Sequence, residues 1–268
     1  MKRTVLLLVL AASVAFINLL PLALILKQAF TPEAESFAWP PTWWPHQLTL
    51  DNFRALNGTV DLGYGLWLSL FVALLTMGST LSLVLPAAWL AAREPRAGQP
   101  LDAVMVVSRL FPSIAVAVPL AALFVTAGLY NNPAGIGLWL AHTLIAMPFA
   151  FFILRSGFRS IPEDLEHAAR LDGASDLGVF WRISLPLARP SLAAAATLVF
   201  LVSWDEFAYA LLLQVTNRPL PPLLYYLAAF GFPGQASAMA AIMLGPALCV
   251  IAVLEPALRS GALTGSGR

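Results

Sequence analysis

The residues best suited to bind a polar solute lie together in "FLVSWDEFAYALLL", within an apolar part of the sequence. There the adjacent carboxylates of Asp205 and Glu206 follow Ser203 and Trp204. Carboxylates accept hydrogen bonds from hydroxyl groups, and an indole ring covers the apolar face of a sugar. These four residues therefore indicate a path for a hydroxylated solute. The alternative interpretation is structural: the carboxylates form an ion pair, for example with Arg109, or a contact to another helix.

The composition requires lipid as the solvent for much of the chain. Of the 268 residues, 59% are hydrophobic and 11% are charged, whereas a soluble domain carries about 25% charged residues. The net charge of +1 offers no general attraction for nucleic acid. Cys249 is the single cysteine, which excludes an intrachain disulfide, and the three histidines lack the spacing of a zinc site.

The sequence has no nucleotide-binding loop of its own. Its only lysines, Lys2 and Lys27, do not end a G-x-x-x-x-G-K motif, which is the motif that cradles phosphates. No nucleophile with an adjacent base stands out either. We therefore expect no catalytic activity and no cofactor in this chain. If ATP drives the protein, a partner must bind ATP and Mg.

Six apolar segments are long enough to cross about 30 Å of hydrocarbon as helices. We predict an all-α membrane protein, with one domain over residues 1–268. An excess of Lys and Arg marks the cytoplasmic side. With the N-terminus inside, eleven of the 15 basic residues fall on that side and three on the other, which predicts N-in, C-in topology. The expected spans cover residues 5–26, 66–92, 101–129, 136–154, 192–213 and 236–254.

Two further features follow from this topology. The outer loop, residues 27–63, contains "FAWPPTWWPHQ", and its indoles are expected at the membrane interface; a surface for an outer partner is the alternative. Arg109 falls inside the third expected span. Its side chain is expected to extend toward the cytoplasmic face, with packing against the carboxylates of Asp205 and Glu206 as the alternative.

The polar stretch between the fourth and fifth expected spans, residues 159–190, has the signals of a helical hairpin. Ser160 and Glu163 have the spacing of a capping box around Pro162. The first short helix is predicted to run to about Leu171, and Gly173 can take the left-handed conformation that ends it.

The second helix of the hairpin is predicted to begin at Ser175 and Asp176 and to stop at Pro186, before Pro190 opens the next span. Its spacing places Leu177, Phe180 and Trp181 on one exposed face. Amphipathic hairpins that bind lipid headgroups are usually basic, whereas acidic residues here at least match the basic ones in number. This charge balance favours a cytoplasmic protein partner over headgroups.

The hairpin resembles the EAA loop in the membrane subunits of binding-protein-dependent ABC importers. That pattern is E-A-A, three residues, glycine, nine residues and I-x-L-P. This chain has His167-Ala168-Ala169, then Gly173, then Ile183-Ser184-Leu185-Pro186. "AARLDGAS", "LPLARP", "LTLDNF" and the closing "RSGALTGSGR" are similar to the carbohydrate-importing, maltose-type branch. The resemblance therefore touches nearly the whole chain.

The resemblance implies a coupling helix near residues 167–173 that enters a cleft on a cytoplasmic ATPase. ATP-driven closure of the ATPase dimer would rock the attached spans and open a central path alternately on the two sides. In the family, the glutamate at the position of His167 pairs with a basic residue of the ATPase. Glu163 or Glu166 could substitute for it from a neighbouring turn, or His167 could donate a hydrogen bond itself; a tolerated, exposed histidine is the alternative. The residues expected at this coupling site are Glu163, Glu166, His167, Ala168, Ala169, Asp172, Gly173, Ile183, Leu185 and Pro186.

We therefore expect the permease subunit of a carbohydrate importer in the bacterial inner membrane. Its partners would be a second permease in a heterodimer, an ATPase dimer, an extracytoplasmic solute-binding protein and the lipid bilayer. Glycerol phosphate, another polyol or an amino acid is the alternative cargo. Two other classes remain: a gradient-driven transporter with Asp205 or Glu206 as proton or cation sites, and an intramembrane enzyme with the same carboxylates as acid and base. The elaborate cytoplasmic hairpin argues against the gradient-driven transporter, which would not require it.

Overall fold

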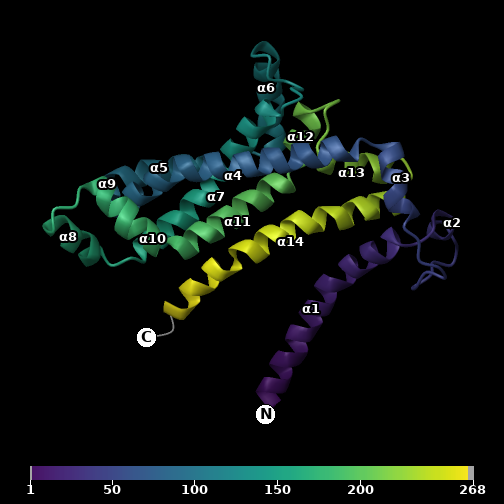
Figure 1. Ribbon diagram of the computed structural model, residues 1–268, viewed down its shortest axis with the longest axis horizontal. Helices are drawn as coiled ribbons and strands as arrows, with labels where there is room; N and C mark the ends of the chain where they lie inside the picture. The colour runs from purple at the N-terminus through teal and green to yellow at the C-terminus, as the bar shows by residue number, and fades with distance from the viewer. Residues whose placement is uncertain (1, 265–268) are drawn as a thin grey trace. The chain divides into compact units, whose positions relative to one another are not determined.

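Long apolar helices dominate the structure, a computed structural model that describes residues 2–264 (Figure 1). The prediction of an all-α fold is confirmed, since these residues form helices and turns without a strand. The helices are α1 (Lys2–Ala29), α2 (Glu33–Ser36), α3 (Asp51–Thr59), α4 (Leu62–Arg93), α5 (Pro95–Val107), α6 (Ser113–Thr126), α7 (Ile136–Arg159), α8 (Glu163–Leu171), α9 (Asp176–Val179), the π-helix η1 (Phe180–Ser184), α10 (Leu185–Leu187), α11 (Arg189–Trp204), α12 (Ala208–Leu213), α13 (Leu220–Ala229) and α14 (Pro233–Thr264).

Four helices in the described part of the chain are long and apolar enough to cross a membrane. They are Thr4–Ala29, Leu62–Arg93, Ile136–Arg159 and Pro233–Arg259. They correspond to the first, second, fourth and sixth expected spans. A fifth span is possible if Asp176–Leu187 and Arg189–Trp204, which meet at an angle of 76°, count together.

The prediction that the third expected span is one continuous helix was wrong. Residues 101–129 contain α5 and α6 with a break at 108–112. Pro112 begins the second piece from an extended conformation, with φ −58° and ψ 139°. A proline has no amide hydrogen to donate and disfavours helical geometry in the residue before it.

The fifth expected span, residues 192–213, is broken as well. α11 ends at Trp204, and α12 begins only at Ala208. The intervening Glu206 uses its carboxylate to accept hydrogen bonds from backbone amides of α12. Side-chain bonds of this kind offer the backbone an alternative to a continuous helix.

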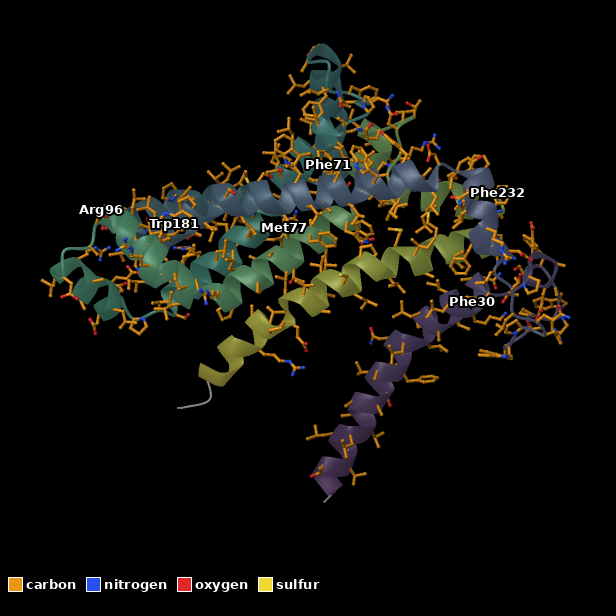
Figure 2. The ribbon with its side chains drawn as sticks, in the orientation of Figure 1. Phe30, Phe71, Met77, Arg96, Trp181 and Phe232 are labelled. Atoms are coloured by element: carbon orange, nitrogen blue, oxygen red, sulfur yellow. The ribbon has the colours of Figure 1, made fainter. Side chains whose placement is uncertain are left out.

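Residues 66–221 and 247–268, described as far as residue 264, form one of two compact units of the chain. Its apolar core lies where α4, α7 and α11 pack, and it includes Ala88, Phe151, Phe158 and Val199. Met77 of α4, labelled in Figure 2, packs against this core. Small side chains let membrane helices approach closely, and alanines occupy many of these core positions.

The contact between α7 and α11 is especially close at Gly157. A Cβ atom added there would lie within 3.0 Å of both Oγ and Cβ of Ser191. Only glycine therefore fits at position 157 without a shift of one helix.

The other compact unit contains residues 1–65 and 222–246, described from residue 2. The apolar side chains of α1 are mostly exposed, so they require lipid or another protein as cover. Beyond α1 the chain is held by Asn52, whose side-chain amide donates to the carbonyls of Ala29 at 3.0 Å and Thr31 at 2.8 Å. The tryptophans of the expected outer loop, at positions 39, 43 and 44, are exposed. Their anchoring at a membrane interface stays a prediction.

Candidate functional site

The hairpin after α7 is the first candidate site, and its main turns are as predicted. α8 ends at Leu171, and Gly173 adopts a left-handed conformation with φ 88°. Ser175 then caps α9, because its hydroxyl accepts a hydrogen bond from the amide of Gly178 at 3.2 Å. Pro190 lies in the first turn of α11, as expected.

The predicted capping box at the start of the hairpin is wrong. Pro162 is the N-cap of α8, and no side chain caps that helix. The hydroxyl of Ser160 instead donates to the carbonyl of Gly157 at 2.7 Å. Because Glu163 is the first residue of the helix rather than the third, its carboxylate cannot complete the box; it lies 4.0 Å from Arg93.

The prediction that Pro186 ends the second helix is also wrong. The chain passes from α9 through the π-helical turn η1 into α10, and Pro186 lies inside α10. In a first turn, the missing amide hydrogen of proline costs no hydrogen bond. The helical path bends at Ala188 instead, before α11.

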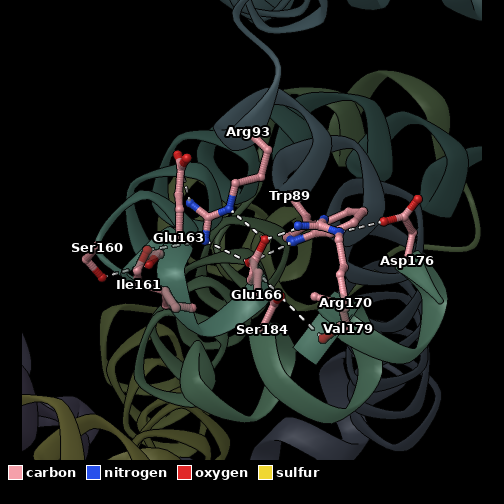
Figure 3. Close-up of polar contacts among 11 residues, drawn as sticks. Trp89, Arg93, Ser160, Ile161, Glu163, Glu166, Arg170, Asp176, Val179 and Ser184 are labelled. Atoms are coloured by element: carbon pink, nitrogen blue, oxygen red, sulfur yellow. Dashed lines mark hydrogen bonds and ion pairs between the residues drawn. The ribbon is translucent and has the colours of Figure 1, made fainter. Parts of the chain in front are cut away.

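Glu166 is the central polar residue of the hairpin, and it is buried, with 1% of its surface exposed. Arg93, at the end of α4, donates to its two carboxylate oxygens at 2.8 and 3.0 Å. Trp89 donates from its indole nitrogen at 3.2 Å, and Ser184 from its hydroxyl at 2.7 Å. Figure 3 shows these donors converging on the one carboxylate. We call this set of Trp89, Arg93, Glu166 and Ser184 the latch.

The latch keeps Glu166 ionised. Burial alone raises the pKa of this carboxyl, but the hydrogen bonds from Arg93, Ser184 and Trp89 and the charge of Arg93 outweigh it, so the pKa lies below its usual value. The guanidinium of Arg93 also donates to the carbonyl of Ile161 at 3.3 Å. The latch therefore joins α8 to α4 and to η1 through satisfied, charge-assisted hydrogen bonds.

The outward face of the hairpin carries most of the other expected coupling residues. Glu163, His167, Ala168, Asp172 and Gly173 are exposed, whereas Ala169, Ile183, Leu185 and Pro186 are partly buried. Glu166 differs from them, because its carboxylate is occupied within the chain. Of the glutamates expected to substitute at His167, only Glu163 is therefore exposed.

Large apolar side chains also lie on this outward face. Leu171 is 90% exposed and Trp181, labelled in Figure 2, is 61% exposed. The predicted exposure of Phe180 is wrong. Its ring is buried between Trp89, at 5.5 Å between ring centroids, and Phe158, at 6.2 Å.

The second candidate site, residues 203–206, lies at the break between α11 and α12. Ser203 and Trp204 are buried, and Asp205 is exposed. The carboxylate of Glu206 accepts hydrogen bonds from the amides of Ala208 at 3.1 Å, Tyr209 at 2.8 Å and Ala210 at 3.3 Å. We expected the two acidic residues to be neighbours on one helix, whereas both lie in the break between α11 and α12. Glu206 caps α12, and Asp205 is the more accessible carboxylate.

His142 of α7 is the residue that sequence reasoning missed in this site. Its Nδ1 atom shares a hydrogen bond of 2.8 Å with the hydroxyl of Ser203. Its buried Nε2 atom lies 3.6 Å from Oε2 of Glu206, without a hydrogen-bond partner among the described residues. The available signal was an ionisable side chain inside an apolar span.

Arg109 lies in the break between α5 and α6, and it does not pair with Asp205 or Glu206. Its guanidinium lies 4.1 Å from the centre of the Phe149 ring on α7. A second guanidinium, that of Arg155 on α7, pairs with Asp102 of α5. Phe149 and Arg155 are six residues apart, which is about 9 Å along α7. Among the side chains that the structure describes, no carboxylate lies within 4.0 Å of Arg109.

The described residues contain no group of three or more His, Cys, Asp or Glu side chains placed to hold a metal ion.

A family model described as "Binding-protein-dependent transport system inner membrane component" matches residues 84–258. This range includes the latch, the hairpin, Arg109 and the residues at 203–206.

Two curated proteins illustrate the similarity. The chain is 32% identical over 261 residues to the sulfoquinovosyl glycerol transport system permease protein SmoH of Agrobacterium fabrum, covering 95% of this chain and 91% of that protein. It is 34% identical over 178 residues to the trehalose transport system permease protein SugB of Mycobacterium tuberculosis, covering 66% of this chain and 64% of that protein.

A solved structure has the same fold. It is a chain of a bacterial ABC transporter involved in the import of the acidic polysaccharide alginate, with a TM-score of 0.75. The match covers 95% of this chain and 96% of that chain, at 19% sequence identity. At that identity the likeness concerns the fold alone.

Proposed function

The chain belongs to the family of binding-protein-dependent transport system inner membrane components, and we propose that it is the permease subunit of an ATP-driven carbohydrate importer. In this proposal it forms a translocation path together with a second permease. A cytoplasmic ATPase dimer, which holds ATP and Mg, drives the transport, and an extracytoplasmic protein delivers the solute. The location is the bacterial inner membrane.

The observation that carries the proposal is the latch beneath the hairpin. A hairpin that transmits a movement to the membrane helices must be held rigidly against them. The carboxylate of Glu166 accepts four hydrogen bonds from side chains of α4 and η1. Above it, the exposed Leu171 and Trp181 offer an apolar contact surface. The hairpin would therefore move with α4 when an ATPase displaces it.

The proposed topology keeps six crossings with both termini inside. Four crossings are the continuous apolar helices. The other two would be the broken segments α5–α6 and α11–α12, each with non-helical residues partway along. Non-helical backbone is tolerated at membrane depth where it is buried in protein or lines a water-filled cavity. The breaks at 108–112 and 205–207 are thus suited to a solute path.

A carbohydrate is the favoured cargo because SmoH and SugB are named as permeases for a sugar glycoside and a disaccharide. The exposed carboxylate of Asp205 and the hydroxyl of Ser203 lie at one of the two breaks. Carboxylates accept hydrogen bonds from sugar hydroxyls. Asp205 is the residue of this group that we assign to the path, whereas Glu206 holds α12.

Site-specific crosslinking tests the coupling role. In a Cys249→Ser background, Leu171→Cys and His167→Cys should each crosslink to a co-expressed ATPase subunit, because both positions are exposed on the hairpin. Trp39→Cys, exposed in the expected outer loop, is the matched control and should not crosslink. Crosslinking of Trp39→Cys alone would overturn the topology. Solute uptake by the chain without an ATPase would favour a gradient-driven transporter instead.

A further inference from the structure

The break between α5 and α6 opens a cavity of about 360 Å³. Its walls come from α5, the break itself, α6, α7 and α12, and most of the lining side chains are apolar. The side chains with polar groups among them are Ser108, Arg109, Ser113 and Tyr209. A volume of this size falls in the range of small-molecule sites, which are mostly apolar with a few polar groups.

Arg109 is the only side chain with a formal charge among the residues that line this cavity. The Phe149 ring supports one face of its guanidinium, at 4.1 Å. Such a contact stabilises a cation but does not neutralise it. An arginine in the apolar part of a membrane protein is costly and normally pairs with another group.

The nearby carboxylates do not supply that pairing by direct contact. Glu206 is engaged with three amides of α12. Asp102 of α5, the helix that precedes the break, pairs with Arg155 instead. The Phe149 ring thus supports the guanidinium of Arg109, whose N–H groups can donate hydrogen bonds to a molecule in the cavity.

We propose that Arg109 binds the anionic group of the transported solute, which makes the solute an acidic sugar that carries a carboxylate or a sulfonate. This inference rests on the proposed function and narrows its substrate class. The planar fork of a guanidinium matches both anions with paired hydrogen bonds. Arg109 is exposed in the chain by itself, and in the apolar surroundings of a membrane the mostly apolar walls would strengthen the interaction.

An anionic lipid headgroup offers the same chemistry, so the experiment must separate the two sources. The full importer complex is reconstituted in nanodiscs of phosphatidylcholine alone and in nanodiscs with about one third phosphatidylglycerol. Glucuronate, a carboxylated hexose, is the acidic probe, and glucose is the matched neutral probe. Binding is measured by calorimetry on the wild type, Arg109→Gln, Arg109→Lys and the control Arg96→Gln. Arg96 is an exposed cation on α5 outside this cavity (Figure 2).

We expect saturable glucuronate binding that glucose does not displace. Loss of one charge-assisted hydrogen-bonding partner should weaken it by about tenfold or more in Arg109→Gln, with part of the affinity kept in Arg109→Lys and all of it in Arg96→Gln. Equal binding of glucose and glucuronate, or an unchanged affinity in Arg109→Gln, would overturn the proposal. Phosphatidylglycerol retention that depends on Arg109, without glucuronate binding, would overturn it in favour of lipid.

A second readout separates this inference from the proposed function. ATP hydrolysis by the complex is measured in the wild type and in Arg109→Gln without solute. Equal basal rates would show that the complex still assembles in Arg109→Gln, so a loss of glucuronate binding in that variant would be the loss of a solute contact and not of folding. If the basal rate collapses in Arg109→Gln, Arg109 is structural and the inference fails. If the wild-type chain binds no ATPase at all, the proposed function fails, while glucuronate binding to the chain still tests the cavity.

Discussion

Arg93 holds Glu166 by two hydrogen bonds, to both carboxylate oxygens, across 73 residues of sequence. The bond from Nη2 measures 2.8 Å and the bond from Nε measures 3.0 Å. This pairing joins the end of an apolar helix to the first helix of the polar hairpin. The pairing thereby makes α4 and α8 move together.

Glu166→Gln should destabilise the protein by about 3–5 kcal/mol, because it removes the counter-charge of the Arg93 guanidinium, whose side chain is only 11% exposed. Glu163→Gln is the matched control. Glu163 is 59% exposed at its side chain and 4.0 Å from the same guanidinium, so its loss should cost about 0–1 kcal/mol. Denaturant unfolding in detergent measures both changes. The double variant Glu166→Met with Arg93→Met should recover part of the lost stability, and equal effects of the two single glutamine variants would contradict the latch.

The stabilisation from Glu166 should depend on pH in one direction. Its pKa is lowered in the folded protein from the usual value of 4.5 for a glutamate carboxyl, so the folded state favours the ionised form. The contribution is fully present above about pH 4.5 and is lost as the pH falls through the lower, folded-state pKa. The difference in unfolding free energy between the wild type and Glu166→Gln should therefore shrink in acid. A difference that stays constant from pH 7 to below the folded pKa would mean that the charge of Glu166 contributes nothing.

Gly173→Ala should weaken the hairpin, because a side chain disfavours the left-handed φ of 88°. The expected cost is about 1–2 kcal/mol. Gly178→Ala is the control, since the contacts of an added Cβ there are ordinary, the closest being 3.4 Å from Ser175 Oγ. Thermal unfolding measures stability, and co-purification with the ATPase measures function. The control should match the wild type or exceed it.

Gly157→Ala should destabilise the contact between α7 and α11, because its Cβ would collide with Ser191. Overpacking of this kind costs about 1–3 kcal/mol. Ser191→Gly in the same chain removes both colliding atoms and should restore most of the loss. Unfolding experiments on the two single variants and the double variant measure this coupling. Simple additivity of the two substitutions would show that the loss in Gly157→Ala does not come from a collision with Ser191.

Local signals in the sequence predicted the hairpin well. Gly173 and Ser175 act on the backbone within a few residues, so their effects are visible without the rest of the fold. The capping box was wrong for an equally local reason: Pro162 takes the N-cap position itself. The end of the second helix was missed because a π-helical turn carries the chain past it into α10.

Contacts across the chain were not predictable from such signals. Glu166 was assigned to a partner protein because its donors, Trp89 and Arg93, lie more than 70 positions away. His142 was considered only as a metal ligand, and its contact with Ser203, 61 positions away, is likewise not visible in the sequence. The breaks at 108–112 and 205–207 were missed because average hydropathy over a window does not report where a helix is interrupted.

The fold at the π-helical turn Phe180–Ser184 depends on the number of residues in that turn. Such a turn holds one residue more than an α-helical turn, and Ser184 ends it with its hydroxyl on Glu166. Inserting one further residue before Ser184 would rotate Ser184 and the residues after it by about 100° and swing that hydroxyl away, although the composition would hardly change. This stretch should therefore accept new side chains far more readily than the gain of a single position.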